Sequence, residues 1–546
     1  MPEKKQKKWI WWKHGVFYHI YPRSFYDSNG DGIGDIPGIL LKLDYLVNLG
    51  VDAIWLSPVF KSPMVDFGYD VTDYYNIDPV FGTKDDFIRL LHEAHKRNIR
   101  VVIDMVLNHT SDRHPWFAES ASSHDNPKHD WYIWQKGNKF KKPNNWRSVM
   151  GGSAWQFDQR LQEYYLHTFF REQPDLNWRN KEVREAFMDI FRHWLDLGVD
   201  GFRLDAVNMI IKDKKFRNNP GLLTGVLWRR RWFTRNQPRS FKIVKQLRKL
   251  LDTYDDRMMV GEVYTLPPGD SEMAGNYLKS GDNAMHLAFD FSLMFKPFSA
   301  RKYFKAIDRW YASIPEKGWP CHVLSNHDLR RIISKYGKGS SKYKRAKVAA
   351  MLLLTLRGTP FIYYGEEIGM QNTSLRRSEI LDPLGKKFWP FYKGRDKART
   401  PMQWSAGNNA GFSVAKPWLP VNPDHVRINV EDEWKDTESM LTFYSSLIRL
   451  RKEHSALFAG QWVPLRMGLD GVIVFNRIST DEKLLILLNF TSREQALSLG
   501  SSFRLEVLLS THKVPHEKME TSLIHIESFE ATLMCDLSYF ETEQFR

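Results

Sequence analysis

The repeated alternation of short apolar runs with longer amphipathic segments most constrains what this chain can fold into. The apolar runs lie at residues 16–21, 53–56, 101–107, 201–204, 258–263, 286–291, 322–324 and 361–364. The clearest amphipathic segments between them lie at 38–49, 84–97, 181–197 and 240–254. Strands that alternate with helices in this way predict an α/β fold, and eight repeats predict a closed parallel (β/α)8 barrel, or TIM barrel. In such a barrel the chemistry lies at the carboxyl ends of the strands.

Two stretches interrupt this alternation. Residues 111–180 follow the third strand, lack helical periodicity and are rich in Trp, His, Asn and Lys, which predicts a subdomain inserted over the barrel mouth. Residues 371–432 are dense in Gly, Pro, Asn and Trp, which is typical of a long functional loop.

The last part of the chain has a different pattern. After an amphipathic helix at 439–454, short strands with alternating polarity are predicted at 472–476, 484–489, 503–509 and 531–537. They predict a small antiparallel β-sandwich domain. The expected organisation is therefore a barrel at 1–110 and 181–457, an insertion at 111–180 and a β domain at 458–546.

The charge and the aromatic content bear on the class of ligand. Lysine and arginine outnumber the acidic residues, giving a formal net charge of +15, which could indicate nucleic acid or an acidic surface as a partner. The basic clusters at 4–8, 212–217 and 229–231 do not form a recognisable nucleic-acid motif, so a charged, solvated surface is the better interpretation. Aromatic residues reach 14% of the chain, with 20 tryptophans, and their faces can stack on sugars as well as fill a core.

The cysteines and the amino-terminal residues indicate the compartment. Cys321 and Cys535 are too few and too far apart for a disulfide framework or a zinc site. The apolar run at 9–12 is too short for a signal-peptide core, and no stretch has the length of a membrane span. We therefore expect a cytoplasmic protein that binds neither membrane nor nucleic acid and is a monomer or homodimer.

Acidic residues, histidines and an arginine lie at the ends of four of the predicted strands. They are Asp104 and His109 at the third strand, Arg203 and Asp205 at the fourth, Glu262 at the fifth, and His327 and Asp328 at the seventh. Taken alone, Arg203 and Asp205 could simply form a buried ion pair. Because all these strand ends meet at one rim of a barrel, solvated polar ends are a poor explanation for the whole set.

Two carboxylates that flank a glycosidic bond suffice for its hydrolysis, and a separation of about 5 Å leads to retention through a covalent intermediate. Arg203 is expected to keep Asp205 ionised, which suits a nucleophile. Glu262 is expected to have a raised pKa in a less solvated site, which suits the acid/base. Asp328 would then bind sugar hydroxyls and favour substrate distortion.

The same strand ends carry a family resemblance. Residues 104–109, 201–205, 262 and 326–328 resemble the four signature regions of the α-amylase family of retaining glycosidases, glycoside hydrolase family 13. Further matches lie at 32–39, 173–177, 358–367 and 398–404, in the order typical of the family. The segments at 173–177 and 398–404 are similar to the oligo-1,6-glucosidase and α-glucosidase branch.

This resemblance implies a role for each residue. Asp205 would be the nucleophile, Glu262 the proton donor and Asp328 the stabiliser of the transition state, with Arg203 orienting the nucleophile. The remaining implied contacts with the first sugar are hydrogen bonds from His109 and His327, stacking of Tyr69, and a grip on the non-reducing end by Asp70 with Arg395, or else Arg399. That grip would make the enzyme exo-acting.

The resemblance also addresses linkage. In this branch Ala or Thr after the nucleophile accompanies α-1,4 cleavage and Val accompanies α-1,6 cleavage, so Ala206 favours an exo-acting α-1,4-glucosidase of maltose-like oligosaccharides. An oligo-1,6-glucosidase, or a transferring or isomerising relative such as a sucrose isomerase or trehalose synthase, remains an alternative. A non-catalytic amylase-like partner protein would lack a catalytic carboxylate and carry a membrane anchor. The basic segment 208–239 would line the entrance, either for an acidic aglycone or simply as a solvated loop.

A final motif concerns metal binding. Residues 27–35 place oxygen ligands at alternate positions with glycines between them, which suits a hard cation. The family resemblance implies one structural Ca²⁺ held by Asp27, Asn29, Asp31, Asp35 and the Ile33 carbonyl. A metal-free turn is the alternative.

Overall fold

The computed structural model of the protein describes residues 9–220, 233–265, 269–279, 284–337, 339, 341–468 and 470–539. The basic clusters at 4–8 and 229–231 lie outside these residues. Among the helices in the described ranges, none has both the length and the hydropathy needed to span a bilayer.

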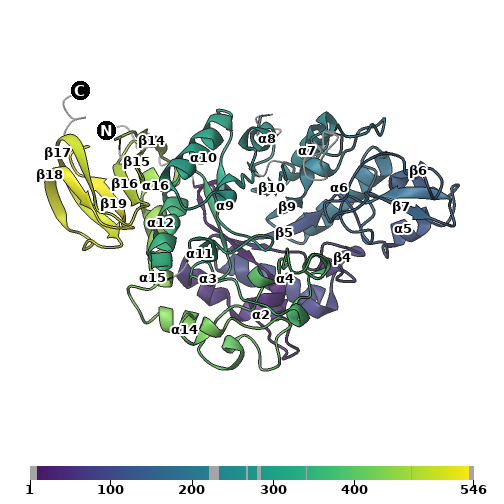
Figure 1. Ribbon diagram of the computed structural model, residues 1–546, viewed down its shortest axis with the longest axis horizontal. Coiled ribbons are helices and arrows are strands. Elements are labelled where there is room, and N and C mark those ends of the chain that lie inside the picture. Colours follow the sequence, from purple (N-terminus) through teal and green to yellow (C-terminus); the bar gives the residue numbers. More distant parts are fainter. Residues whose placement is uncertain are drawn as a thin grey trace.

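Eight parallel strands form the predicted barrel at the centre of the molecule (Figure 1). They are β1 (Phe17–Ile20), β2 (Ala53–Leu56), β5 (Arg100–Val106), β9 (Gly201–Asp205), β10 (Met258–Gly261), β11 (Leu287–Ala288), β12 (Cys321–Val323) and β13 (Thr359–Tyr363). Their order is β11-β10-β9-β5-β2-β1-β13-β12, and a parallel bridge between Phe289 and Cys321 joins the two edge strands. Each predicted apolar run overlaps one of these strands, so the barrel prediction is confirmed.

The barrel strands consist mostly of apolar residues because both of their faces are buried. Phe17, Val102 and Phe361 point into the barrel and pack in one interior core. Their neighbours Tyr18 and Ile362 belong to the larger core between the barrel and its helices. Alternate residues of each strand therefore face the barrel axis. The polar side chains at the carboxyl ends of the strands follow the same alternation, so every second one points into the barrel mouth.

Helices cover the outside of the barrel. The longer ones are α4 (Lys84–Lys96), α6 (Lys181–Asp196), α7 (Pro238–Leu251), α10 (Ala300–Ser313), α12 (Ser341–Thr355) and α15 (Met440–Glu453). Short ones are α1 (Trp11–His14), α8 (Ser271–Asn276), α9 (Ser292–Phe295), α11 (Ile332–Lys335) and α16 (Ser455–Phe458). The helix predicted at 38–49 is two helices, α2 (Ile36–Leu41) and α3 (Leu43–Leu49), with Asp35 capping α2 through the backbone N–H of Gly38.

Two polar connections follow the second and third barrel strands. The antiparallel pair β3 (Phe60–Lys61) and β4 (Asp73–Ile77) encloses the Gly68 turn. The insertion at 111–180 contains α5 (Pro115–Ser120) and a separate antiparallel sheet of β6 (Trp134–Lys136), β8 (Glu163–Leu166) and β7 (Trp155–Asp158). A backbone bridge from His109 to Asp175 ties this insertion to the barrel rim, and a second bridge, from Tyr132 to Leu176, lies within the insertion.

The stretch at 371–432 is irregular, as predicted, with short helices that include α13 (Pro383–Lys387) and, at its end, α14 (Val430–Glu433). Beyond α15 the chain forms β14 (Gln461–Leu465), β15 (Val472–Ile478), β16 (Lys483–Asn489), β17 (Gln495–Ser510), β18 (Lys518–Ile526) and β19 (Ala531–Asp536). All six strands are hydrogen-bonded in one antiparallel sheet, in the order β14-β15-β16-β19-β17-β18.

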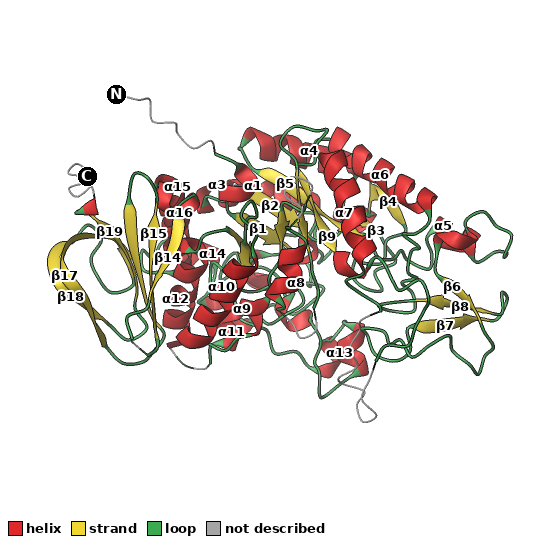
Figure 2. Ribbon diagram, turned by 90° about the horizontal axis from the view of Figure 1, so that it is seen from above, coloured by secondary structure: helices red, strands yellow, loops and turns green. Residues whose placement is uncertain are grey.

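This C-terminal sheet has an apolar core on each face. Ile486 and Leu533 pack with the barrel helices, whereas Leu487 and Val507 pack with Ile524 in a second core within the domain. One continuous sheet thus encloses a core of its own, as a sandwich does. The sheet and the inserted β6-β8-β7 sheet lie at opposite ends of the molecule (Figures 1 and 2).

Candidate active site

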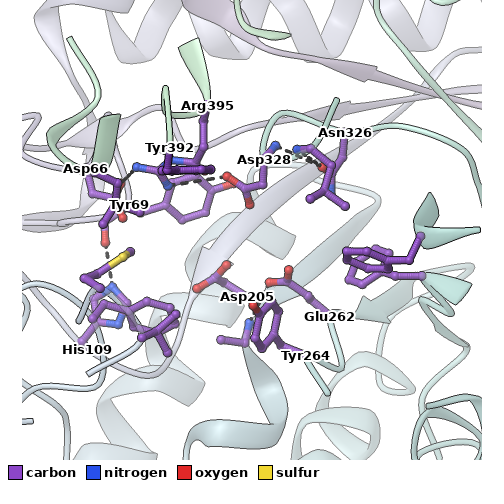
Figure 3. Close-up of a pocket in the computed structure, with 18 residues that line it drawn as sticks. Asp66, Tyr69, His109, Asp205, Glu262, Tyr264, Asn326, Asp328, Tyr392 and Arg395 are labelled. Carbon is purple, nitrogen blue, oxygen red and sulfur yellow. Dashed lines mark hydrogen bonds and ion pairs between the residues drawn. The ribbon is translucent and has the colours of Figure 1, made fainter. Parts of the chain in front are cut away.

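The barrel strands bring the predicted carboxylates into one pocket. Arg203 and Asp205 are two residues apart on β9, so both side chains point into the barrel mouth. Because Gly261 pairs with Leu204, the following residue, Glu262, lies beside Asp205. Figure 3 shows these two carboxylates side by side, with Asp328 and Arg395 on the opposite wall of the pocket.

Arg203 is the centre of the polar network beneath this pocket. Its Nη1 donates to Asp205 Oδ1 at 2.7 Å and to Asp104 Oδ1 at 2.7 Å, while its Nη2 donates to Glu262 Oε2 at 2.6 Å. The guanidinium is 2% exposed, so these charge-assisted bonds form in a low dielectric, where they hold all three carboxylates in fixed positions. The predicted contact of Arg203 with Asp205 is present, and Asp104 and Glu262 bind the same guanidinium.

The carboxyl groups of Glu262 and Asp205 are adjacent, but their different environments give them different pKa values. Burial raises the pKa of Glu262 to about 8, and the nearby charges of Asp205 and Asp328 add to the effect, although Arg203 opposes it. Burial also raises the pKa of Asp205, to about 6, again against the influence of Arg203. Between these two values Asp205 is an anion and Glu262 carries a proton, which is the division of roles that a retaining glycosidase needs.

Asp328 lies in a strongly basic corner. Arg399 Nη2 donates to Asp328 Oδ1 at 2.8 Å, and Arg395 Nη1 lies 3.5 Å from the same oxygen. Burial by itself would raise the pKa of Asp328, but His327 and the two arginines outweigh it and hold this pKa well below its ordinary value. Asp328 is therefore an anion at every pH at which the protein is expected to work.

Tyr69 lines the pocket and packs against His327, which is buried and is not among the lining residues. Their rings stack with centroids 5.4 Å apart, and the Tyr69 hydroxyl lies 2.9 Å from His327 Nε2 and 3.0 Å from Asp104 Oδ2. Burial lowers the pKa of His327 to about 3, so its imidazole is neutral. His109 lines the pocket, and its Nε2 lies 2.8 Å from the Tyr69 carbonyl oxygen. These three predicted binding residues are thus brought together.

The prediction for Asp70 is wrong. Its carboxylate is fully buried under the loop, where it accepts the backbone N–H groups of Val65 and Asp66, each at 2.9 Å. Asp66 lines the pocket instead, and its Oδ1 accepts a bond of 2.6 Å from Arg395 Nη2. The left-handed conformations of Phe67 and Gly68 between the two acids turn the chain, so that the first carboxylate faces the pocket and the second faces the loop.

Arg395, the preferred partner in the prediction, lies in the pocket and is further held by Asp382. Arg399, the alternative, supports Asp328 from behind and also donates to the His327 carbonyl oxygen at 2.8 Å. The two arginines therefore hold different parts of the same wall.

The described part of the basic segment at 208–239 does not line this pocket. Lys212 is instead buried, where its ammonium lies 2.9 Å from Asp175 Oδ2 and donates to Asn108 Oδ1 at 2.6 Å. Arg217 pairs with Asp213, with Nη2 and Oδ1 2.8 Å apart. Residues 221–232 lie outside the described part of the chain.

Sequence reasoning missed the apolar side chains around the mouth. They are Val149, Met150, Phe169, Tyr264, Phe291, Phe295, Leu329, Leu384 and Tyr392. These residues come from the insertion, from loops after several strands and from the stretch at 371–432. Because they are scattered over loops and short helices, no periodic pattern could have identified them as a group.

The loop predicted to bind calcium connects β1 to α2. Its side-chain oxygens accept bonds from the loop itself: Asp31 Oδ1 from the Ile33 N–H at 2.8 Å and Asn29 Oδ1 from the Asp31 N–H at 2.9 Å. Asp35 caps α2, and Asp27 accepts three backbone N–H groups. Among the described residues, these carboxylates do not gather around a common point. Calcium binding there stays a prediction.

The chain is similar to known proteins over most of its length. Residues 19–460 match the model of the alpha amylase catalytic domain. The chain is 40% identical to the oligo-1,6-glucosidase of Parageobacillus thermoglucosidasius, across 96% of this chain and 98% of that protein. It is 41% identical to the probable alpha-glucosidase of Rhizobium meliloti (strain 1021), across 92% of this chain and 95% of that protein.

A solved structure extends the likeness to the fold. The alpha-glucosyl transfer enzyme XgtA superimposes with a TM-score of 0.91 at 38% identity, covering 97% of this chain and 100% of that one. The family predicted from the four signature regions is confirmed, because the matched domain contains all three carboxylates of the pocket. The chain belongs to the α-amylase family of glycoside hydrolases, glycoside hydrolase family 13.

Proposed function

We propose that the protein is an exo-acting, retaining α-glucosidase that removes terminal α-1,4-linked glucose from maltose-like oligosaccharides. The observation that carries this proposal is the single guanidinium of Arg203, which holds Asp205 and Glu262 side by side in one pocket. The second observation is the ion pair of Asp66 with Arg395 in that pocket. Such a pair can bind several hydroxyls of one terminal sugar and so favours an exo-acting enzyme.

In the first step, Asp205 attacks the anomeric carbon while Glu262 gives its proton to the glycosidic oxygen, which leaves with the aglycone. A covalent glucosyl ester forms at Asp205 as the glycosidic bond breaks. Asp328, held by Arg399, binds sugar hydroxyls and stabilises the positive charge that develops on the ring. In the second step Glu262, now an anion, takes a proton from water, which displaces Asp205 from the same face that the aglycone left.

Two measurements test this mechanism. Proton NMR of early maltose hydrolysis should show α-glucose appearing before mutarotation, and mass spectrometry with a slow fluorinated α-glucosyl fluoride should trap a glucosyl ester on Asp205. The Asp205→Asn variant, which keeps the size of the side chain, should lose at least about 10³-fold in kcat. Release of β-glucose, or full turnover by this variant, would remove the proposal.

The linkage rests on Ala206, which lines the pocket directly after the nucleophile. A methyl side chain leaves this wall of the entrance open, and in the related branch that favours α-1,4 bonds. The relatives include enzymes named for both linkages, so the ratio of kcat/KM on maltose and isomaltose decides between them. A ratio in favour of isomaltose would make the protein an oligo-1,6-glucosidase.

Glucosyl transfer is a second candidate because apolar side chains surround the pocket mouth. Phe291, Phe295 and Leu329 cannot hydrogen-bond water but can pack on an acceptor that awaits the covalent glucosyl group. The similar enzyme XgtA is named for α-glucosyl transfer. Product analysis at high maltose, with and without a phenolic acceptor, measures the ratio of transfer to hydrolysis. A non-catalytic role is disfavoured because all three carboxylates are present in one pocket.

We also propose that residues 27–35 hold one structural Ca²⁺. The support for this proposal is that five oxygen donors stand at alternate positions of this segment. The ion would fix the loop between β1 and α2 and take no part in bond cleavage.

We further propose a reducing, cytoplasmic location, supported by two cysteines that are both free thiols, and a monomer or homodimer. Cell fractionation and light scattering test the last two proposals.

A further inference from the structure

We propose that His124, His129 and Glu163 bind one Zn²⁺ ion on the inserted subdomain, at a site separate from both the catalytic pocket and the predicted calcium loop. His124 and His129 lie in the connection between α5 and β6, and Glu163 begins β8. None of the three lines the catalytic pocket. The subdomain that carries them lies at the end of the molecule away from the C-terminal sheet (Figure 1).

The donor atoms of these residues have the spacing of a metal site. Glu163 Oε2 lies 3.2 Å from His129 Nε2, and Glu163 Oε1 lies 3.7 Å from His124 Nδ1. All three side chains present donor atoms within 4.8 Å of one another. Ligands of a tetrahedral zinc ion with metal–donor bonds of about 2.0–2.1 Å lie about 3.4 Å apart, so only small side-chain movements are needed.

The hydrogen bonding of His129 suits a metal ligand. Its Nδ1 lies 2.9 Å from the carbonyl oxygen of Ser120, which can only accept, so Nδ1 carries the hydrogen. Nε2 therefore faces the Glu163 carboxylate with a lone pair unless a proton or a metal ion lies between them. A metal-bound histidine typically donates its other N–H to a carbonyl or carboxylate in this way, which fixes the ring.

The surroundings of Glu163 suit a metal ion. The residue is 6% exposed, and among the described residues its ion pairs are only those with the two histidines. His129 is additionally fixed by stacking on Trp134, with centroids 5.3 Å apart. A buried carboxylate and two imidazoles match the mixed oxygen and nitrogen ligands of zinc. The fourth position would be open to water, because His124 is exposed.

The sequence supports this inference independently. His124 and His129 are separated by four residues, within the spacing of three to five that is typical of zinc-binding histidine pairs. A bound ion would cross-link the exposed connection at 121–128 to the buried strand β8. It would thereby stabilise the subdomain that contributes Val149 and Phe169 to the pocket wall, without touching the reacting groups.

Isothermal titration calorimetry on the full-length protein tests the proposal. The protein is stripped with a chelator and returned to calcium-containing buffer, so that the predicted calcium loop stays supplied, and is then titrated with Zn²⁺. We expect one Zn²⁺ per chain, a rise of several degrees in Tm, and slower amide hydrogen exchange at 121–131. Replacement of Zn²⁺ by Co²⁺ should give the visible absorption of a tetrahedral cobalt ion.

Variants assign the binding to this cluster. His129→Gln and Glu163→Gln should each weaken Zn²⁺ binding by at least about 100-fold, and the exposed His124→Gln provides a variant that does not disturb the core. His525→Gln is the matched control, because His525 forms an exposed pair with Glu494, at 2.7 Å, without a second histidine. Unchanged Zn²⁺ affinity in the three variants, or no stoichiometric binding by the unaltered protein, would leave only an imidazolium–carboxylate ion pair and overturn the proposal.

Discussion

Arg203 and its three carboxylate partners show how one residue sets the chemistry of a site. The spacing of Arg203 and Asp205 in the sequence places both on one face of β9, so their contact could be predicted from the strand period. The contacts of Arg203 with Asp104 and Glu262 come from neighbouring strands. They depend on strand register, which local sequence does not encode.

The different pKa values of Glu262 and Asp205 predict how activity depends on pH. Glu262 must be protonated and its pKa is about 8, so kcat/KM should fall as pH rises through that value. Asp205 must be ionised and its pKa is about 6, so kcat/KM should also fall as pH drops below it. A bell-shaped profile on maltose between about 6 and 8 is the expected result.

The variant Glu262→Gln provides the control for this profile. It should abolish the alkaline limb and retain more activity on p-nitrophenyl α-glucoside than on maltose, since p-nitrophenolate leaves without a proton. An alkaline limb that persists in Glu262→Gln would assign that titration to another group.

Asp66 and Asp70 form a matched pair for a second prediction. Asp66→Asn weakens a charge-assisted bond to Arg395 in the pocket, worth about 1.5–3 kcal/mol, so kcat/KM on maltose should fall roughly 10- to 100-fold. Asp70→Asn should lower Tm but change kcat/KM less than about threefold, because Asp70 accepts only loop donors. Steady-state kinetics and thermal unfolding of both variants measure the difference. The opposite ranking would restore Asp70 as the binding residue.

At the scale of elements, the inserted subdomain is attached to the barrel through buried polar contacts. Asp175, which follows β8, accepts Thr168 N–H and Asn108 Nδ2–H, each at 2.9 Å, and lies 2.9 Å from Lys212 Nζ. Asn108 lies in the connection after β5 and Lys212 in the connection after β9. Three segments that are far apart in the sequence thus meet at one buried carboxylate.

We expect Lys212→Met to destabilise this junction strongly. The methionine fills a similar volume but leaves Asp175 buried without a cation, at a cost of about 3–5 kcal/mol. A lower Tm and faster hydrogen exchange in 163–177 are the expected readouts. The exposed Lys214→Met serves as the control, and the double variant Lys212→Met with Asp175→Asn should recover part of the loss. Equal stability of Lys212→Met and Lys214→Met would contradict the assigned role.

The loop between β1 and α2 provides a prediction for metal removal. If Ca²⁺ fixes this loop, a calcium-selective chelator should lower Tm by several degrees, and added Ca²⁺ should restore it. Activity at 25 °C should change little because the loop contributes no side chain to the pocket. Asp31→Asn should reduce the Ca²⁺-dependent shift, and a Tm that does not respond to Ca²⁺ would indicate a metal-free turn.

At the scale of the whole molecule, the C-terminal sheet is joined to the barrel by buried arginines. Arg477 on β15 donates to the Thr355 carbonyl at the end of α12 and to the Gly460 carbonyl. Arg451 on α15 donates to the carbonyls of Leu354 and Leu356 at 2.8 and 3.2 Å. The last carbonyls of a helix have no partner within the helix, so the two arginines complete α12 from outside.

Arg477→Met should therefore destabilise the molecule without changing its chemistry. The buried carbonyls would lose their donor, which costs about 1–3 kcal/mol for each unsatisfied group. Thermal unfolding should occur at a lower temperature, while kcat on maltose at 25 °C stays as in the unaltered protein. The exposed Arg493→Met, in the loop between β16 and β17, is the control. A drop in kcat without a drop in Tm would show that the sheet influences the pocket directly.

The sequence by itself determined the barrel, the insertion, the C-terminal β domain, the family and the three carboxylates that the pocket brings together. These follow from periodicity and from motifs in which the informative residues are neighbours in the chain. Only the tertiary structure decided between Asp66 and Asp70, because two left-handed residues turn the loop between them. The tertiary structure also gathered the apolar side chains at the pocket mouth, buried Lys212, and placed His124 and His129 beside Glu163. Each of these arrangements depends on contacts between segments that are distant in the sequence.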